Sequence, residues 1–341
     1  GCSSISSYID QKGFVLYSHY HRIMFPLITG LLYYLGAYIG VHFAALEVGI
    51  VILWPPNAVL LAALLSRPPR FWWPLLLAVV AAEVTADIAA FTLTQSLLFA
   101  AINITECLLA ASVIRHFLGG EIDWHKPKDL SLFLVTTLFF VSPIAAVGGA
   151  SVYALLLTSD TPFLTFWRLW WIGDATGLII LTPFIHLLFN AGRPLRLEGS
   201  AWPHYLELFA AWSVGLVACY LVFSWPLHWN NYLALTPLAV ILAPIWVAIR
   251  FGSLVTSCLA TSVALYAVFF TAAGIGPFVR ENPDHSALLT QEFVLLFTAM
   301  VLYISAFVRQ HSEANQQLKT LALTDDLTGI ANRRQIKNLG E

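Results

Sequence analysis

The sequence predicts an all-α protein that crosses a membrane several times. Hydrophobic residues make up 59% of its 341 residues and charged residues only 11%, a balance that the surface of a water-soluble protein does not tolerate. Long apolar runs recur along the chain, and about 20 apolar residues in a helix span the roughly 30 Å hydrocarbon core of a bilayer. The net charge of -2 offers no basic surplus for nucleic acid. We therefore expect the lipid bilayer, and no nucleic acid, as a partner.

Ten apolar runs are long enough to be tested as spans, so about ten transmembrane helices are expected. The second run is short and contains Pro55 and Pro56, which remove backbone donors and bend or break a helix. It is either a kinked span or a re-entrant helix, and a re-entrant helix would change the parity of the count. The runs lie near residues 23–46, 48–66, 71–93, 95–115, 130–158, 161–190, 203–225, 231–249, 253–274 and 287–309.

The distribution of lysine and arginine predicts the orientation of the chain, because positive residues accumulate in short cytoplasmic loops. With ten spans and a cytoplasmic amino terminus, one set of loops and tails holds twelve of these residues, whereas the opposite set holds only Arg280. We therefore expect both termini in the cytoplasm. The twelve are Lys12, Arg22, Arg67, Arg70, Arg115, Lys126, Lys128, Arg193, Arg196, Arg250, Arg309 and Lys319.

Polar side chains within the spans call for a reason, because a charge at the centre of a membrane helix costs about 2.5 to 3.5 kcal/mol on insertion scales. With a helical rise of 1.5 Å per residue, several polar residues of spans two, three, four and six lie roughly 10 to 20 Å below the outer surface. Glu83 and Asp87 are four residues apart, so they share one helix face. Asn103 and Glu106, three residues apart, also share a face. We expect these faces to meet protein and not lipid.

Span six begins with the tryptophan-rich stretch FWRLWWIGDATG. Its residues Trp167, Trp170, Trp171 and Asp174 follow the i, i+3, i+4, i+7 spacing of one helix face. An aromatic wall with a carboxylate at its base suits a cation or an aromatic ligand. Alternatively, the tryptophans form an interfacial belt and the two glycines allow close helix packing.

Three interpretations of the buried polar residues stay open. The carboxylates are protonated or paired with Arg168 and only specify packing, or they bind a ligand on the outer side, or they form a proton or ion pathway. No metal site is indicated, because the four cysteines form no CxxC motif and the histidines do not group. The candidate ligand-binding residues are Asn57, Glu83, Asp87, Asn103, Glu106, Arg168, Trp170, Trp171 and Asp174.

The last span is expected to continue as a polar helix through RQHSEANQQLKTLA at residues 309–322. Apolar and small polar residues recur there at spacings of three and four, which is the pattern of a parallel coiled coil. A solvated helix without a partner is the alternative. The seam consists of Val308, His311, Asn315, Leu318 and Ala322.

The chain then reads LTDDLTGIANRR at residues 323–334. This stretch resembles the opening segment of the GGDEF family of diguanylate cyclases, whose pattern is D-x-L-T-G-[LI]-x-N-R-R. In that family the segment joins a signalling helix to the catalytic domain, so the resemblance implies a role in coupling. The coupling residues that it implies are Asp325, Leu327, Thr328, Asn332 and Arg333.

The same resemblance implies that the full-length protein is a nucleotidyltransferase that makes cyclic di-GMP from two GTP, with Mg as cofactor. Because the chemistry of the family joins two GTP-loaded halves, a homodimer is also implied. The metal-binding carboxylates and the GG[DE]EF turn of the family lie downstream of this segment, so we expect the rest of the α/β domain beyond Glu341. No catalytic residue is assigned and no cofactor is visible in residues 1–341. The loop sequence GGEID at 119–123 has one acid too few to replace the turn.

The apolar part carries WPPNA at residues 54–58 and WWIGDATGLIILTP at residues 170–183, together with a proline-rich eighth span. These features resemble the first type of membrane-associated sensor domain (the MASE family) of bacterial signalling proteins. The resemblance implies a multi-pass protein of the bacterial inner membrane that senses an unknown small ligand or ion on the outer side. Proline-broken helices with clustered acids also suit a proton- or ion-coupled small-molecule transporter. A membrane anchor that only dimerises the output domain is a third candidate.

The expected organisation follows from these segments. A cytoplasmic segment at residues 1–22 precedes the membrane sensor domain at residues 23–309. A helical linker at residues 310–323 then leads into the start of the GGDEF domain at residues 324–341. We therefore expect a sensor whose input reaches a cytoplasmic cyclase through one helix.

Overall fold

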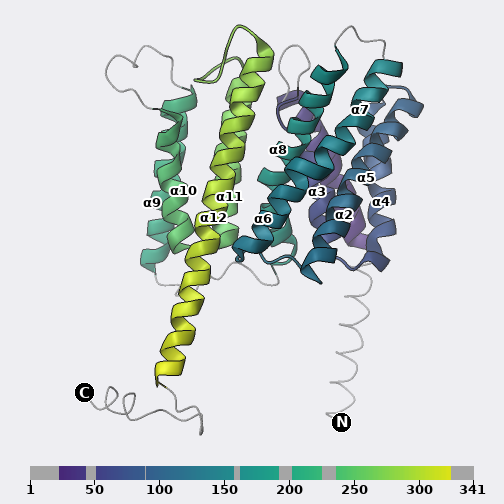
Figure 1. The fold of residues 1–341 in the computed structure, drawn as a ribbon. Coiled ribbons are helices and arrows are strands. Elements are labelled where there is room, and N and C mark those ends of the chain that lie inside the picture. The colour runs from purple at the N-terminus through teal and green to yellow at the C-terminus, as the bar shows by residue number, and fades with distance from the viewer. Residues whose placement is uncertain are drawn as a thin grey trace, which may run out of the picture.

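The computed structural model describes residues 23–43, 51–88, 90–156, 162–191, 202–224 and 236–323. Helices are the only regular elements among these residues, and no strand occurs in them. Figure 1 shows the helices side by side in a bundle with roughly parallel axes. The prediction of an all-α fold is confirmed.

The amino-terminal helices gather around one apolar core, on the right in Figure 1. Within it α3 packs against α2, α5 and α8, while α2 also packs against α4. Large buried side chains such as Tyr33, Leu60 and Phe133 fill this core. Its elements are α2 (Phe25–Phe43), α3 (Pro55–Leu65), η2 (Pro69–Phe71), α4 (Trp72–Asp87), α5 (Leu93–Leu118), α6 (Pro127–Val135), η3 (Thr136–Val141), α7 (Ser142–Leu156) and α8 (Phe163–Phe189).

The carboxy-terminal helices surround a second apolar core, on the left in Figure 1. Phe223, Val263 and Phe297 are among its buried side chains, and α8 packs against α11 and α12. Ile52 and Leu53, which precede α3, also belong to this second core. The elements are α9 (Trp202–Cys219), η4 (Tyr220–Ser224), η6 (Pro237–Ile241), α10 (Leu242–Arg250), α11 (Ser253–Ala272) and α12 (Pro283–Leu323). The start of α3 and α8 therefore link the two cores.

Six helices in the described residues are long and apolar enough to cross a membrane, so the prediction of ten spans is not confirmed. They are Leu93–Leu118, Pro127–Leu156, Phe163–Phe189, Trp202–Ser224, Ser253–Ala272 and Pro283–Gln316. The helices in runs one, two and eight are shorter apolar helices, and α4 has only 16 residues, two of them acidic. The difference arises because an apolar run includes residues outside the helix, as in the third run, where α4 ends at Asp87. The protein is nevertheless a multi-pass membrane protein.

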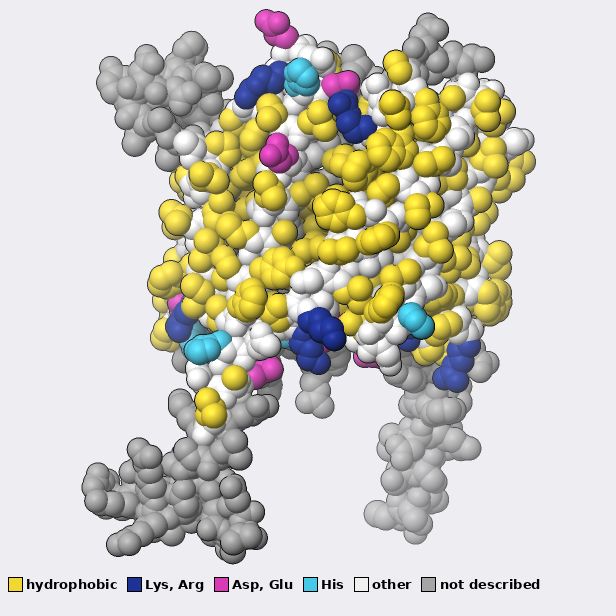
Figure 2. All heavy atoms as spheres, viewed as in Figure 1, with side chains coloured by type: hydrophobic (Ala, Val, Ile, Leu, Met, Phe, Trp, Pro, Cys, Tyr) yellow, Lys and Arg dark blue, Asp and Glu magenta, His cyan; other side chains and the backbone are white. Residues whose placement is uncertain are grey.

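The surface agrees with contact to lipid. In Figure 2 hydrophobic side chains cover most of the visible face, and Lys, Arg and His gather near its upper and lower rims. Leu27, Leu77 and Leu155 are 60%, 61% and 77% exposed, which is costly in water and favourable in hydrocarbon. The chain termini, for which a cytoplasmic location was predicted, lie outside the described residues.

The last helix, α12, runs without interruption for 41 residues from Pro283 to Leu323. At 1.5 Å per residue it is about 62 Å long, about twice the thickness of a hydrocarbon core. Figure 1 shows its final turns, in yellow, leaving the bundle on the side where α2 begins. The last span therefore continues as a polar helix, as the sequence indicated.

Candidate functional site

A break in the helical backbone positions the candidate site. Residues 51–54 are not helical, although Ile52 and Leu53 are fully buried. The Trp54 N–H donates to the Gly173 carbonyl at 3.3 Å, and Gln291 Nε2 of α12 donates to the Ile52 carbonyl at 3.0 Å. Non-helical backbone is tolerated at membrane depth only where protein groups or water supply its hydrogen bonds. Here α8 and α12 supply them.

A glycine on α8 makes this close approach feasible. A Cβ atom added to Gly177 would lie 2.1 Å from the Trp54 carbonyl oxygen, far inside contact distance. Because glycine has no side chain, the α8 backbone touches the turn from which α3 starts. The helix α3 begins directly after this turn, with Pro55 and Pro56 at its first positions, where their missing N–H groups cost nothing. Asn57 is thereby fixed in the interior.

Asn57 is the first member of a buried hydrogen-bond network. Its Nδ2 donates to Glu106 Oε2 at 2.6 Å and to Asn103 Oδ1 at 3.3 Å. Cys107 Sγ donates to the Asn57 carbonyl at 3.3 Å. These polar contacts join α3 to α5, which also share the apolar core.

Asn103 carries the network from α5 to two further helices. Its Nδ2 donates to Glu83 Oε1 of α4 at 2.8 Å and to the Tyr33 hydroxyl oxygen of α2 at 3.4 Å. The amide therefore sits at a junction of four helices. Removal of this one side chain would disconnect Glu83 from Asn57.

Glu106 extends the network to the second half of the amino-terminal core. Its carboxyl group lies near Asp174 of α8 and near Ser142 at the start of α7. Asp174 in turn lies near the indole of Trp170, but Ser142 Oγ, Asp174 Oδ2 and Trp170 Nε1 form no hydrogen bond. The exposed fraction of Glu106 is 0%, that of Ser142 is 0% and that of Asp174 is 3%. Two carboxyl groups thus lie side by side where neither water nor lipid reaches them.

Most of the unpaired polar atoms in the network are oxygens, and the one unpaired nitrogen is Trp170 Nε1. Among the described residues, Lys, Arg and His form ion pairs only with acids outside the network, such as Asp284 and Glu207. The buried oxygens without a hydrogen-bond partner include Asn57 Oδ1, Glu83 Oε2, Glu106 Oε1, Ser142 Oγ and Asp174 Oδ2. Buried polar atoms normally find partners. Such an arrangement suits a species that brings positive charge or donor hydrogens.

The structure brings together six of the nine predicted ligand-binding residues, namely Asn57, Glu83, Asn103, Glu106, Trp170 and Asp174. Asp87 is only partly buried and lies one turn of α4 further out, where it contacts Ser96. Their role in binding a ligand stays a prediction.

Two predicted residues lie apart from the network. Arg168 pairs with Asp284 at 3.3 Å, with 37% of its side chain exposed, so it is not the partner of a buried acid. Trp171 Nε1 donates to the Leu138 carbonyl at 2.6 Å and ties α8 to η3. The i, i+3, i+4 spacing does not distinguish these side chains from Trp170. The ring of Trp170 lies against Phe99 at 5.5 Å and occupies the space that a Cβ on Gly149 would fill.

Four residues of the site were not predicted. Tyr33, Cys107 and Ser142 are fully buried members of the network, and Gln291 holds the broken segment. Hydroxyl groups in apolar runs give little signal, because many satisfy themselves on their own helix. Gln291 is the exception, because an amide inside the last span stands out in the sequence.

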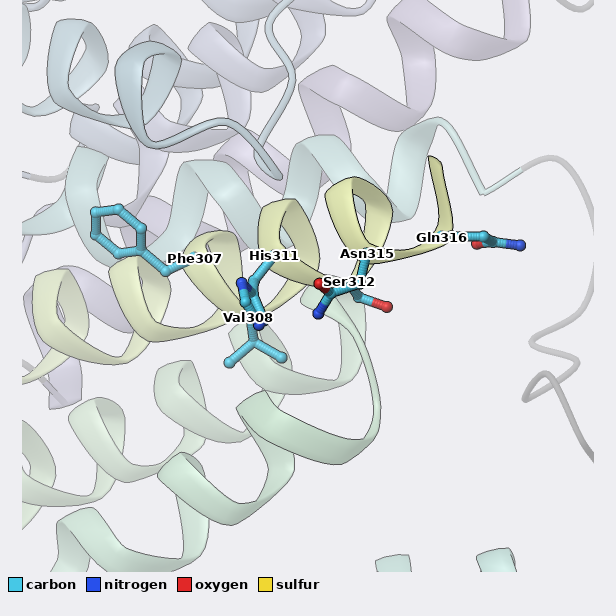
Figure 3. A pocket seen from close by; sticks show the side chains of 6 residues that line it. All are labelled: Phe307, Val308, His311, Ser312, Asn315 and Gln316. Atoms are coloured by element: carbon cyan, nitrogen blue, oxygen red, sulfur yellow. The ribbon is translucent and has the colours of Figure 1, made fainter. Parts of the chain in front are cut away.

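The network is closed to solvent in this structure. Its acid and amide side chains are each at most 3% exposed, namely Asn57, Glu83, Asn103, Glu106 and Asp174. Two surface hollows occur elsewhere in the described part. One of about 760 Å³ follows the end of α12, where Phe307, His311 and Asn315 line it (Figure 3). The other, of about 340 Å³, lies along α9 and includes Val217 and Ala239. A ligand would reach the network only after a rearrangement.

Fold and site together define a multi-pass helical membrane protein with a closed network of acids and amides in its amino-terminal half. Residues 26–312 match the MASE1 family, and the chain belongs to this family of membrane sensor domains. No curated protein matches the chain. No solved structure matches it either.

Proposed function

We propose that the chain is the input module of a receptor in the bacterial inner membrane, which regulates a cytoplasmic diguanylate cyclase that makes cyclic di-GMP from two GTP. Membership of a membrane sensor family supports the input role. The output rests on the GGDEF resemblance of the closing stretch. That stretch, with Asp325, Leu327, Thr328, Asn332 and Arg333, lies outside the described residues, so the cyclase, its GTP and its Mg are part of the proposal.

The observation that carries the proposal is a continuous set of contacts from the network to α12. Asn57 is separated from the broken segment only by Pro55 and Pro56, and Gln291 of α12 donates to the Ile52 carbonyl of that segment at 3.0 Å. The same helix continues to Leu323. A shift of the network that moves the start of α3 must therefore break the Gln291 hydrogen bond or move α12.

A signal acts on such a system only by favouring one of two arrangements. A ligand with equal affinity for both shifts nothing, and a change from 1:99 to 99:1 needs about 5.5 kcal/mol of differential binding. Buried acids with unpaired oxygens can supply a large difference, because occupation changes their charge balance. The closed network is the element that we expect a signal to bias.

The output step requires two chains. Beyond the bundle, Val308 is partly exposed and His311, Asn315 and Leu318 are exposed on α12. Their spacings of three and four suit a parallel coiled coil. We propose that two copies pair along this face, which would align two cyclase domains for the joining of two GTP molecules.

A transporter is the second candidate, because the non-helical segment 51–54 beside buried acids resembles the broken helices of coupled carriers. Uptake or current in proteoliposomes would favour it. A nucleotide response without flux would favour the receptor.

The test uses the full-length protein in cells. Asp174→Asn and Gln291→Leu should each change the cellular level of cyclic di-GMP severalfold while membrane insertion stays normal. Gln310→Leu is the matched control for the second change, because Gln310 is exposed on the same helix. An unchanged nucleotide level in both variants, at normal protein levels, would overturn the input role of the network.

A further inference from the structure

We propose that Asn57, Glu106, Ser142 and Asp174 bind one small monovalent cation of the sodium class, admitted from the outer side. This inference deepens the proposed receptor function and rests on it only for the meaning of the ion, because binding itself is a property of the isolated chain. The four side chains come from α3, α5, α7 and α8. Occupation would therefore act on α3, which follows the broken segment, and on α8, which accepts a hydrogen bond from it.

The charge of the site sets the first requirement. Glu106 and Asp174 interact directly while 0% and 3% exposed, and two unpaired negative charges in contact are not stable in a low-dielectric interior. The amino-terminal end of α3 supplies only about half an elementary charge. It cannot neutralise even one carboxylate. Among the described residues no Lys, Arg or His forms an ion pair with either acid, so we expect the positive charge to come from a bound species.

The hydrogen bonds indicate how much charge is needed. Asn57 Nδ2 lies 2.6 Å from Glu106 Oε2, and such short contacts are typical of an ionised acceptor. One proton shared between Glu106 and Asp174 leaves one negative charge on the pair. A single monovalent cation then makes the site neutral.

The unpaired oxygens supply the ligands. Both Nδ2 hydrogens of Asn57 are used, by Glu106 and Asn103, so the amide orientation is fixed and its Oδ1 is left as an acceptor without a donor. Ser142 Oγ, Glu106 Oε1 and Asp174 Oδ2 are also unpaired. One proton can satisfy one or two of these atoms. The proposed cation would lie among these four oxygens, because it attracts oxygen lone pairs from several sides at once.

The kinds of ligand atom in the site indicate which class of metal ion it suits. No group of three or more His, Cys, Asp and Glu suited to a metal ion occurs in the described residues, which disfavours zinc and other transition metals. Calcium takes about six to eight oxygen ligands and carries two charges, one more than the single negative charge of a pair that shares one proton. Two acids and two neutral oxygens suit a singly charged hard cation.

A route from the outer side is visible in the order of the acids. Asp87 is partly exposed at the outer end of α4, and Glu83 lies one turn deeper. Glu83 accepts from Asn103, which accepts from Asn57 beside Glu106. At 1.5 Å per residue, Glu106 lies about 20 Å along α5 from its outer end at Leu93. Carboxylate and amide oxygens thus occur at successive depths, as passage of a dehydrated cation requires.

The first experiment needs no variant. Equilibrium binding of radioactive sodium ion to the purified chain in lipid nanodiscs should be saturable, with about one ion per chain. Unlabelled sodium and lithium should compete, whereas potassium and choline at equal ionic strength should not. Absence of saturable binding, or equal competition by potassium, would overturn the proposal.

The second experiment assigns the site. Asp174→Asn should weaken sodium binding at least about tenfold, a change of about 1.4 kcal/mol in binding free energy. Ser142→Ala removes one unpaired hydroxyl, so it should weaken binding severalfold while the protein still folds. Glu281→Gln is the control, because Glu281 is an exposed acid preceding α12. Undiminished sodium binding by Ser142→Ala and any folded Asp174→Asn protein would overturn the assignment.

The experiments can reject the receptor function and the cation site independently of each other. Sodium binding lost on substitution, together with cyclic di-GMP levels that ignore the same substitutions, would keep the cation site and reject the receptor. A nucleotide response to Asp174→Asn without any sodium binding would keep the receptor and reject the cation. Protons alone would then be the species that neutralises the pair.

Discussion

The two halves of the bundle treat buried polar groups differently. In the amino-terminal half and α8, acids and amides such as Glu83, Asn103 and Asp174 are buried and depend on partners from other helices. From residue 202 onward, no acid or base is buried among the described residues. The buried polar groups there are hydroxyls and one amide. Thr256, for example, donates to the Gly252 carbonyl of the preceding turn at 2.8 Å.

This difference helps to distinguish polar groups that only serve helix packing from polar groups that have a function. A hydroxyl that bonds to its own helix is satisfied before the bundle assembles, so it places no demand on a neighbour. A carboxylate cannot be satisfied in that way and is costly in a membrane unless several helices cooperate. The carboxy-terminal half shows that a bundle of this family packs without buried acids. Glu83, Glu106 and Asp174, the buried acids of the network, therefore point to a role other than packing.

The largest expected effect tests the close approach that links the halves. Gly177→Ala should destabilise the protein by more than about 3 kcal/mol, because the added methyl overlaps the Trp54 carbonyl and backbone cannot move away cheaply. Gly215→Ala, in the carboxy-terminal half, should cost less than about 1.5 kcal/mol, since its Cβ would meet the Ala243 Cβ at 3.3 Å. Reversible unfolding in mixed micelles gives both values. Equal costs would show that the Gly177 contact is not special.

A smaller effect compares the two kinds of polar group. Asn103→Leu removes the donor of Glu83 Oε1 and one of the two acceptors of Asn57 Nδ2, and a buried polar atom left unpaired costs about 1 to 3 kcal/mol. Thr256→Val removes a hydroxyl that serves only its own helix, so we expect about 1 kcal/mol or less. The same unfolding measurement applies. A larger loss from Thr256→Val would contradict the comparison.

The smallest effect concerns a partly exposed ion pair between α8 and α12. Arg168→Gln should cost less than about 1 kcal/mol and become neutral at high salt, because the Arg168 and Asp284 side chains are 37% and 29% exposed. The measurement is the unfolding free energy at two salt concentrations. A large, salt-independent loss would place Arg168 among the network residues after all.

Much of the candidate site could be predicted from the sequence, because polar groups are costly in lipid. That cost identified Glu83, Asn103, Glu106 and Asp174 before any contact was known, and the two prolines located the break before α3. The spacing of residues along one helix predicts which side chains share a face. It does not predict which side chain of another helix each of them contacts. For this reason Arg168 was grouped with the acids although it pairs with Asp284.

Other features lacked a sequence signal. Ser142 resembles any hydroxyl in an apolar run, and its position beside Glu106 depends on how α7 crosses α5. The prediction of ten spans is not confirmed, because hydropathy does not locate helix ends. Six described helices are long and apolar enough to cross a membrane, and the other apolar helices are shorter.

The helix α3 has eleven residues, all of them buried. At 1.5 Å per residue it reaches about 16 Å, roughly half of a hydrocarbon core. It therefore gains little by entering the bilayer alone as it leaves the ribosome. Its place between α2, α5 and α8 exists only once α8 has been synthesised, so insertion of this region must be completed late. A cell that halts translation before α8 would hold an unfinished chain open to membrane proteases.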